Sequence, residues 1–271
     1  MLRKIVAEKV KEIDALLAGT ALRDMERSMA GLPDTISMKK RFSQRKRPVG
    51  VIAEVKKASP SKGIIREDFS PVDIAKEYGR ADVEAISVLT DSPFFQGKLA
   101  YLKEIKNRIE KPIPLLRKDF HLHPAQLYEA RYYGADAVLL IAAILEREKL
   151  QEMAREARAL GLEVLVEVHT EEELDLVLSA IEPDLLGINN RDLATFTTSL
   201  STTLKLVERI PPSLITISES GISSADDITV LEQAHIDGVL VGEHFMRQQS
   251  IAEAVKSLVG PAVQQPKDIG V

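Results

Sequence analysis

Lysine and glutamate side chains stand at the ends of several short apolar runs in this sequence: Glu54, Lys56, Lys118, Glu167 and Glu219. Taken singly, each could be a strand-end residue that reaches solvent. Together they would form a ring of two lysines and three glutamates, which could donate and accept protons from positions fixed by rigid strands. A buried ion pair contributes little stability because desolvation offsets the attraction, so a functional role is favoured for Glu54 and Lys56.

Residues that suit substrate binding follow the later apolar runs. The segment Gly-Ile-Asn-Asn-Arg-Asp-Leu at 187–193 contains Asn189 and Arg191, which could hydrogen-bond a hydroxyl group or a carboxylate. A plain turn is the alternative, because Asn and Asp are common in turns. An H-x-H pair, His121 and His123, could suit a metal, but we find no matched third ligand and predict no metal site.

Eight runs rich in Val, Ile and Leu predict the strands that would position these side chains. Patterns of helical period separate the runs, each long enough for a crossover between parallel strands. The repetition predicts an α/β fold, a closed (β/α)8 TIM barrel. A doubly wound sheet would normally carry a glycine-rich turn after its first strand, where this chain has KKASPSKG. The predicted strands are Val51–Val55, Ala85–Leu89, Ile113–Arg117, Ala137–Ile141, Glu163–Val166, Leu185–Ile188, Leu214–Ser218 and Gly238–Val241.

Helix boundaries support this alternation. Helix starts are predicted at Ser70-Pro71, Pro124, Ser224, Ser250 and Thr170, the last as a capping box with Glu173. Helix ends are predicted near Gly134, Gly161 and Gly260, because glycine readily adopts the left-handed conformation.

In such a barrel the active site lies at the carboxyl ends of the strands, and the loops after strands seven and eight often bind phosphate. Ser220-Gly221 and Gly242 occupy these loops, and glycine permits a close approach to the backbone. Ser59 and Lys62, after the first strand, could add phosphate contacts or belong to a surface turn. The sequence therefore favours an enzyme that acts on a small phosphorylated molecule.

The residues before the first strand are helical in pattern. We predict a helical extension over 1–48 that packs across one barrel end, a catalytic barrel over 49–260 and a tail over 261–271. Six basic side chains within 39–47 are expected to be solvated; the alternative is a positive rim that guides an anionic substrate.

Composition narrows the function classes. The 271 residues are 45% hydrophobic, which is enough for one large core, and no segment suits a signal peptide or a membrane span. The absence of cysteine excludes disulfides and Cys-ligated zinc and favours a cytoplasmic location. The net charge of −5 argues against nucleic acid or a membrane surface as a partner. We expect a monomer.

Five motifs follow one another at successive predicted strand ends: EVKKASPSKG, RKDF, VEVH, GINNRDL and SESGI. With the N-terminal extension, they make nearly the whole chain resemble the indole-3-glycerol phosphate synthase family of tryptophan biosynthesis. The resemblance implies conversion of 1-(o-carboxyphenylamino)-1-deoxyribulose 5-phosphate to indole-3-glycerol phosphate, with loss of CO2 and water and without a cofactor or metal.

The resemblance also implies roles for individual residues. Lys118 matches the general acid of ring closure, and Glu167 matches the base of dehydration. Lys56 matches the lysine that pairs with the substrate carboxylate and could assist dehydration, with Glu54 orienting it. The division of acid and base duties among these four stays open.

The remaining matches concern substrate placement. Asn189 and Glu219, counted with the catalytic set, and Arg191 and Ser220 match residues that position the substrate, while Ser59, Gly221 and Gly242 match the phosphate site. Glu243 departs from the pattern, because some relatives have serine at this position. A carboxylate there would repel the phosphate.

Three other functions remain as alternatives. A Schiff-base aldolase would need a depressed pKa at Lys118. Phosphoribosylanthranilate isomerase shares the fold but fits the strand-end lysines less well. A non-catalytic sensor of a phosphorylated metabolite would bind without turnover.

Overall fold

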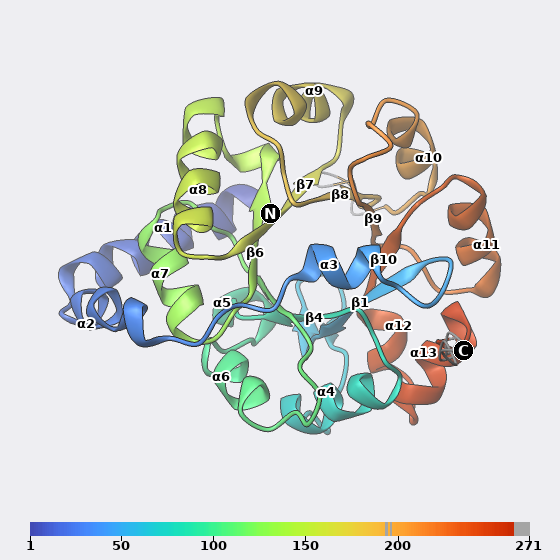
Figure 1. Ribbon diagram of the computed structural model, residues 1–271, viewed down its shortest axis with the longest axis horizontal. Helices are drawn as coiled ribbons and strands as arrows, with labels where there is room; N and C mark the ends of the chain where they lie inside the picture. Colours follow the sequence, from blue (N-terminus) through green and yellow to red (C-terminus); the bar gives the residue numbers. More distant parts are fainter. Residues whose placement is uncertain (193–194, 196, 263–271) are drawn as a thin grey trace, which may run out of the picture.

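The computed structural model describes residues 1–192, 195 and 197–262. Eight parallel strands close into a barrel in the order β1-β10-β9-β8-β7-β6-β5-β4, with helices around the outside (Figure 1). This closure confirms the predicted (β/α)8 barrel and excludes the open doubly wound sheet. The barrel strands are β1 Gly50–Val55, β4 Ala85–Leu89, β5 Leu115–Lys118, β6 Ala137–Ile141, β7 Glu163–Val168, β8 Leu185–Asn189, β9 Thr216–Glu219 and β10 Gly238–Val241.

Two strands are shifted relative to their predicted bounds. β5 and β9 begin two residues later than predicted, and each ends one residue later. Pro114 has no N–H to donate to a neighbouring strand, and the N–H of Leu214 donates to the carbonyl of Pro211 in a turn. Both strands therefore begin later in the chain. The shift makes Lys118 and Glu219 the last residues of their strands.

Helices connect the strands on the outside of the barrel. The principal ones are α4 Pro71–Arg80, α6 Ala100–Lys106, α7 Ala125–Tyr132, α8 Arg147–Ala159, α9 Glu171–Ala180, α10 Ser201–Val207, α11 Ala225–Gln233 and α13 Ile251–Val259. Short elements occupy the loops at the carboxyl ends: α5 Ser92–Phe95, η2 Ala142–Ile144, α12 Glu243–Met246 and an unpredicted hairpin of β2 Ala58–Ser59 and β3 Gly63–Ile64. None of the described helices is long and apolar enough to cross a membrane.

Most predicted helix caps are present. Ser70 and Ser224 accept a hydrogen bond at their helix starts, and Gly134, Gly161 and Gly260 have positive φ angles just beyond helix ends. Of the two hydrogen bonds of the capping box predicted at Thr170, one is present and the other was wrongly predicted. Thr170 accepts from the backbone of Glu173, but the Glu173 carboxylate accepts from the N–H of His169 instead.

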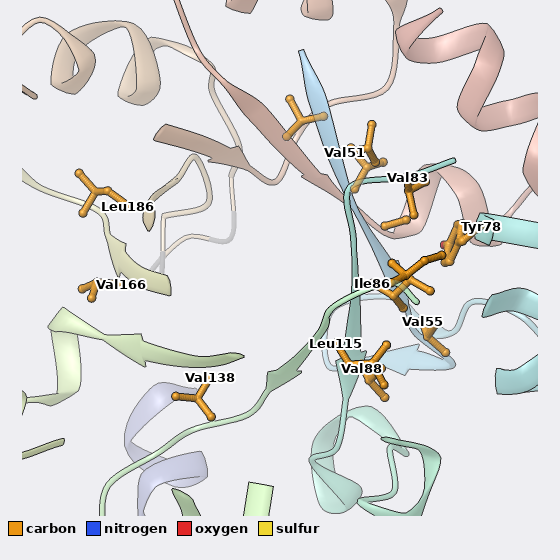
Figure 2. Close-up of a cluster of buried hydrophobic side chains, with 14 of the residues drawn as sticks. Val51, Val55, Tyr78, Val83, Ile86, Val88, Leu115, Val138, Val166 and Leu186 are labelled. Atoms are coloured by element: carbon orange, nitrogen blue, oxygen red, sulfur yellow. The ribbon is translucent and has the colours of Figure 1, made fainter. Parts of the chain in front are cut away.

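Apolar side chains form two layers, one inside the barrel and one between the strands and the helices. Figure 2 shows part of the outer layer, to which Val51 and Val55 of β1 contribute. Ile52, on the alternate face, belongs to the inner layer. Because successive side chains of a strand point to opposite faces, Glu54 shares the interior face with Ile52. The inner apolar layer therefore ends at a charged residue.

The N-terminal extension comprises α1 Leu2–Ala18, α2 Ala21–Ser28, η1 Met29–Gly31 and α3 Met38–Ser43. It reaches both barrel ends, so the prediction of packing across one end was incomplete. At the amino ends of the strands, α3 lies across the opening (Figure 1) and buries Met38 and Phe42 completely. At the carboxyl ends, Lys9 of α1 places its Nζ 3.0 Å from the carboxylates of Asp91 and Asp119.

The basic segment 39–47 does not form a rim around a substrate site. Arg47 is buried, donates to the carbonyl of Ala81 and lies 3.7 Å from Glu84. Arg45 lies 3.1 Å from Asp237 at the amino-end side of β10. The segment therefore fastens the extension to the amino ends of the strands. Both sequence interpretations were wrong for Arg47, while Lys39 and Lys40 are exposed as expected.

Candidate active site

A cavity opens at the carboxyl ends of the barrel strands, and most of the residues selected from the sequence line it. Each of the eight barrel strands, or the loop that follows it, contributes to the wall. Lys62 is not among the lining residues. The selected residues that the structure brings together are Glu54, Lys56, Ser59, Lys118, Glu167, Asn189, Arg191, Glu219, Ser220, Gly221 and Gly242.

The lysines and glutamates are close enough to interact directly. The Nζ of Lys118 lies 3.3 Å from Oε2 of Glu167 and 3.6 Å from Oε2 of Glu219. The Nζ of Lys56 lies 2.5 Å from Oε2 of Glu54. The three carboxylates are buried, so their charges interact in surroundings where water screens them weakly.

This arrangement separates the protonation states of the neighbouring groups. Burial alone would lower the pKa of Lys118, but Glu167, Glu219 and Glu54 raise it above its ordinary value. Burial alone would raise the pKa of Glu167, but Lys118 and His169 hold it well below its usual range. Burial, together with repulsion from Glu167, raises the pKa of Glu219 to about 8 in spite of Lys118. At neutral pH the site therefore presents a cationic acid beside one ionised and one protonated carboxyl group.

Two glycines leave room for the charged ring. A Cβ atom on Gly187 would lie 2.1 Å from Oε1 of Glu219, and one on Gly242 would lie 2.2 Å from Oε2 of Glu54. Any larger residue would displace a carboxylate. Gly242 was selected from the sequence only for a phosphate contact, because its proximity to Glu54 depends on the closure of the barrel.

The loop after β9 has an unusual backbone. Ser220 and Gly221 both have positive φ angles, 67° and 77°, and the first is rare for a residue with a side chain. The buried amide of Asn190 donates to the carbonyl of Ser220 and to Oγ of Ser218. Asn190 therefore supports this loop, whereas its neighbour Asn189 lines the cavity.

Comparison with known proteins identifies the family. A sequence model described as indole-3-glycerol phosphate synthase matches residues 2–258. The enzyme of that name from Geobacillus thermodenitrificans is 46% identical over 260 residues, covering 96% of this chain and 97% of the relative. The one from Acetivibrio thermocellus is 50% identical over 208 residues, covering 77% and 79%. This chain belongs to the indole-3-glycerol phosphate synthase family.

Membership of the indole-3-glycerol phosphate synthase family confirms the function predicted from the motifs. The chain is an enzyme of tryptophan biosynthesis, a carboxy-lyase that acts on a small phosphorylated substrate. The matching family is none of the three alternatives considered from the sequence, which were a Schiff-base aldolase, phosphoribosylanthranilate isomerase and a non-catalytic sensor. The raised pKa of Lys118 also argues against the aldolase, since an amine nucleophile must lose its proton.

Solved structures of lower similarity agree with the fold alone. The 3-hexulose-6-phosphate synthase of Salmonella typhimurium superposes with a TM-score of 0.60 at 15% identity, covering 78% of this chain and 97% of that one. A mutant tryptophan synthase α-subunit from Pyrococcus furiosus gives 0.58 at 14% identity, covering 80% and 99%.

The indole-3-glycerol phosphate synthase cavity also has an apolar wall that was not predicted. Leu2 and Ile5 of α1 contribute to it, together with Phe95 and Phe120, whose ring centroids lie 6.2 Å apart. Lys9 joins the loops that carry the two rings, because Asp91 precedes α5 and Asp119 precedes Phe120. Phe120 stands in the RKDF motif, two residues after Lys118, and this position is the one signal that could have indicated it.

His121 and His123, the pair considered for a metal and set aside, both have contacts within the protein. His121 is buried with Nδ1 2.8 Å from the carbonyl oxygen of Leu139, and Nδ1 of His123 accepts from the N–H of Ala125. Burial and Arg117 lower the pKa of His121 to about 3, so its ring is neutral. Within the described part of the chain, no group of three His, Cys, Asp or Glu side chains could hold a metal ion.

Proposed function

We propose that Lys118 is the general acid of indole ring closure. Its ammonium group lies in the cavity beside the ionised carboxylate of Glu167, which keeps it protonated, and 3.6 Å from the carboxyl group of Glu219; this is the observation that carries the assignment. When the aromatic ring carbon of the substrate attacks the carbonyl carbon, Lys118 delivers its proton to the carbonyl oxygen. Loss of CO2 then returns the electron pair of the broken carbon–carbon bond to the ring system.

Dehydration requires an acid for the leaving hydroxyl group and a base for the proton that restores aromaticity. Glu167 suits the base, because Lys118 and His169 keep its carboxylate ionised inside the cavity. Lys56, 2.5 Å from Glu54, suits the substrate carboxylate and could assist the departure of water. Glu219 stabilises Lys118 from its other side.

Substrate placement follows from the cavity walls. The apolar wall suits the aromatic ring of the substrate, since burial of an aromatic face there removes apolar surface from water. Asn189, Arg191 and Ser220 line the polar side and would position the substrate. With the substrate bound in this way, its reacting carbon atoms would lie near Lys118.

The phosphate group would lie at the loops after β1, β9 and β10, which contain Ser59, Gly221 and Gly242. Glu243 also lines the cavity, but its Oε1 accepts two bonds from the guanidinium of Arg247. The guanidinium group therefore offsets the negative charge that Glu243 would bring near the phosphate.

Other properties of the chain remain proposals based on the sequence. We propose that the enzyme works in the cytoplasm as a monomer, without a cofactor or metal and without nucleic acid or membrane as partners. The extension over 1–48, the barrel over 49–260 and the tail over 261–271 are its proposed divisions. Residues 263–271 of that tail lie outside the described residues.

The test is a fluorescence assay of the purified full-length chain with the carboxyphenylamino-deoxyribulose phosphate. The chain has no tryptophan, so a growing indole signal would be distinct from protein emission. We expect the signal to grow equally with and without a metal chelator, and to disappear in Lys118→Met. Binding of substrate without turnover would support a sensor instead.

A further inference from the structure

His169 lies directly beyond β7, two residues after Glu167 and on the same face of the chain. Its Nε2 lies 3.4 Å from Oε1 of Glu167. The ring is mostly buried and does not line the cavity that contains Lys118. His169 therefore contacts the proposed base from outside the cavity that contains Lys118.

The two oxygens of Glu167 face different cations. Oε2 lies 3.3 Å from Nζ of Lys118, and Oε1 lies 3.4 Å from Nε2 of His169. A carboxylate held by one cation can rotate about its terminal bond. Nε2 of His169 has no hydrogen-bond partner among the described residues, so it acts on Oε1 as a close charge, and charges beside both oxygens restrict rotation of the carboxylate.

Glu173 in the first turn of α9 holds the imidazole from its other side. Its Oε2 lies 3.1 Å from Nδ1 of His169 and accepts from the His169 backbone N–H at 2.7 Å. Side-chain exposure rises outward along this chain of groups, from 4% at Glu167 to 9% at His169 and 20% at Glu173. The three side chains therefore form a series that extends from the cavity wall towards the surface of the barrel.

We propose that His169, anchored by Glu173, is a positioning residue that holds Glu167 ionised and oriented for proton abstraction. This inference rests on the proposed role of Glu167 as the base of dehydration. A cation between two carboxylates has no need to touch the substrate; it acts through the group that does.

The surrounding charges are consistent with a cationic imidazole. Burial alone would lower the pKa of His169, but Glu167 and Glu173 raise it to about 10. From the neighbouring strand ends, Lys118 of β5 and Glu219 of β9 face Glu167. From the end of β8 and the segment after it, Asn189, Arg191 and Asp192 line a second hollow together with His169 and Glu173.

The first test compares the pH dependence of kcat in wild type and in Glu173→Gln. As pH rises through about 10, His169 loses its proton in the wild type and kcat should fall. Removal of one carboxylate should move this alkaline decline to lower pH by about one unit or more. Glu173→Asp keeps the charge and should retain most of the wild-type profile. Glu172→Gln, on the exposed side of the same turn, is the matched control.

The second test replaces the imidazole. His169→Gln should lower kcat by about 10–100-fold with little change in KM, because it alters the base and leaves the substrate-binding wall intact. His235→Asn, at an exposed histidine, should leave kcat unchanged. A fall in thermal stability with an unaltered pH profile in both Glu173→Gln and His169→Gln would overturn the proposal, as would wild-type kcat in His169→Gln.

A third measurement separates this inference from the proposed function. NMR titration of the histidines, with the His169 signal assigned by its loss in His169→Gln, reports the imidazole pKa without substrate. The proposed role of His169 is supported if its pKa drops in Glu167→Gln and also in Glu173→Gln. An unshifted pKa of His169 in both variants overturns it. Lack of turnover by the wild type would contradict the proposed function. The titration would still show whether His169 interacts with Glu167 and Glu173.

Discussion

Acidic side chains at the two barrel ends have very different partners. At the amino ends, Glu84, Asp136, Asp184 and Asp237 each stand just before a strand and accept the N–H of the first or second residue of the preceding barrel strand, at 2.6–2.9 Å. At the carboxyl ends, Glu219 leaves Oε1 buried without a hydrogen-bond partner. These four amino-end carboxylates are occupied by backbone N–H groups, whereas Glu219 at the carboxyl ends keeps one oxygen available to a substrate. Such a division of stability and function is expected between the ends of this barrel.

The sharpest test of this contrast is Lys118→Met at the carboxyl ends. We expect kcat for ring closure to fall by at least about 10³-fold, because a general acid contributes about 10²–10⁴-fold and the ion pair with Glu167 is also lost. The thermal melting temperature should change little. Lys205→Met, at an exposed lysine, is the control. Turnover near the wild-type rate would remove Lys118 from the mechanism.

The opposite result is expected for Phe42→Ala at the amino ends. Phe42 is fully buried against the glycines at the starts of β1 and β10. Its truncation leaves a cavity, so the free energy of unfolding should fall by about 3–5 kcal/mol. Denaturant unfolding measures the loss, and kcat per folded molecule at low temperature should stay unchanged. A matching fall in kcat would mean that the two ends are coupled.

Glu219 predicts a pH dependence of stability. Its pKa is raised from 4.5 to about 8 in the folded state, so the folded chain binds more protons than the unfolded chain between these values. The free energy of unfolding should therefore decrease as pH rises from about 4.5 to about 8, by a few kcal/mol at most. Glu219→Gln should flatten this slope. An equal slope in both proteins would place the proton elsewhere.

A smaller effect is expected for Asp136→Asn. The amide keeps one carbonyl acceptor for the N–H of Leu115 but loses the charge that pairs with Lys106 at 2.5 Å. The free energy of unfolding should fall by about 1–3 kcal/mol without an effect on kcat. Chemical denaturation and steady-state kinetics measure the two quantities. A loss of activity larger than the loss of folded protein would contradict a purely structural role.

Local patterns accounted for the barrel and for the polar residues of its cavity. The apolar runs marked the strands, and polar residues after them marked the carboxyl ends. The short-range rules failed where a partner lay far along the chain. Arg47 was expected in solvent because Glu84 is 37 positions away. Phe95 was overlooked because an apolar side chain gives no indication of whether it faces a core or a cavity.

The sequence by itself determined the strand and helix alternation, the family and the residue types that line the site, because hydrophobic periodicity and strand-end motifs are local. Only the closed barrel decided how these groups act on one another. It places Lys118 between Glu167 and Glu219, brings α1 from the chain start to the cavity, and sets His169 beside Glu167. Proton affinities depend on such distances and on burial, and both exist only after distant strands have come together.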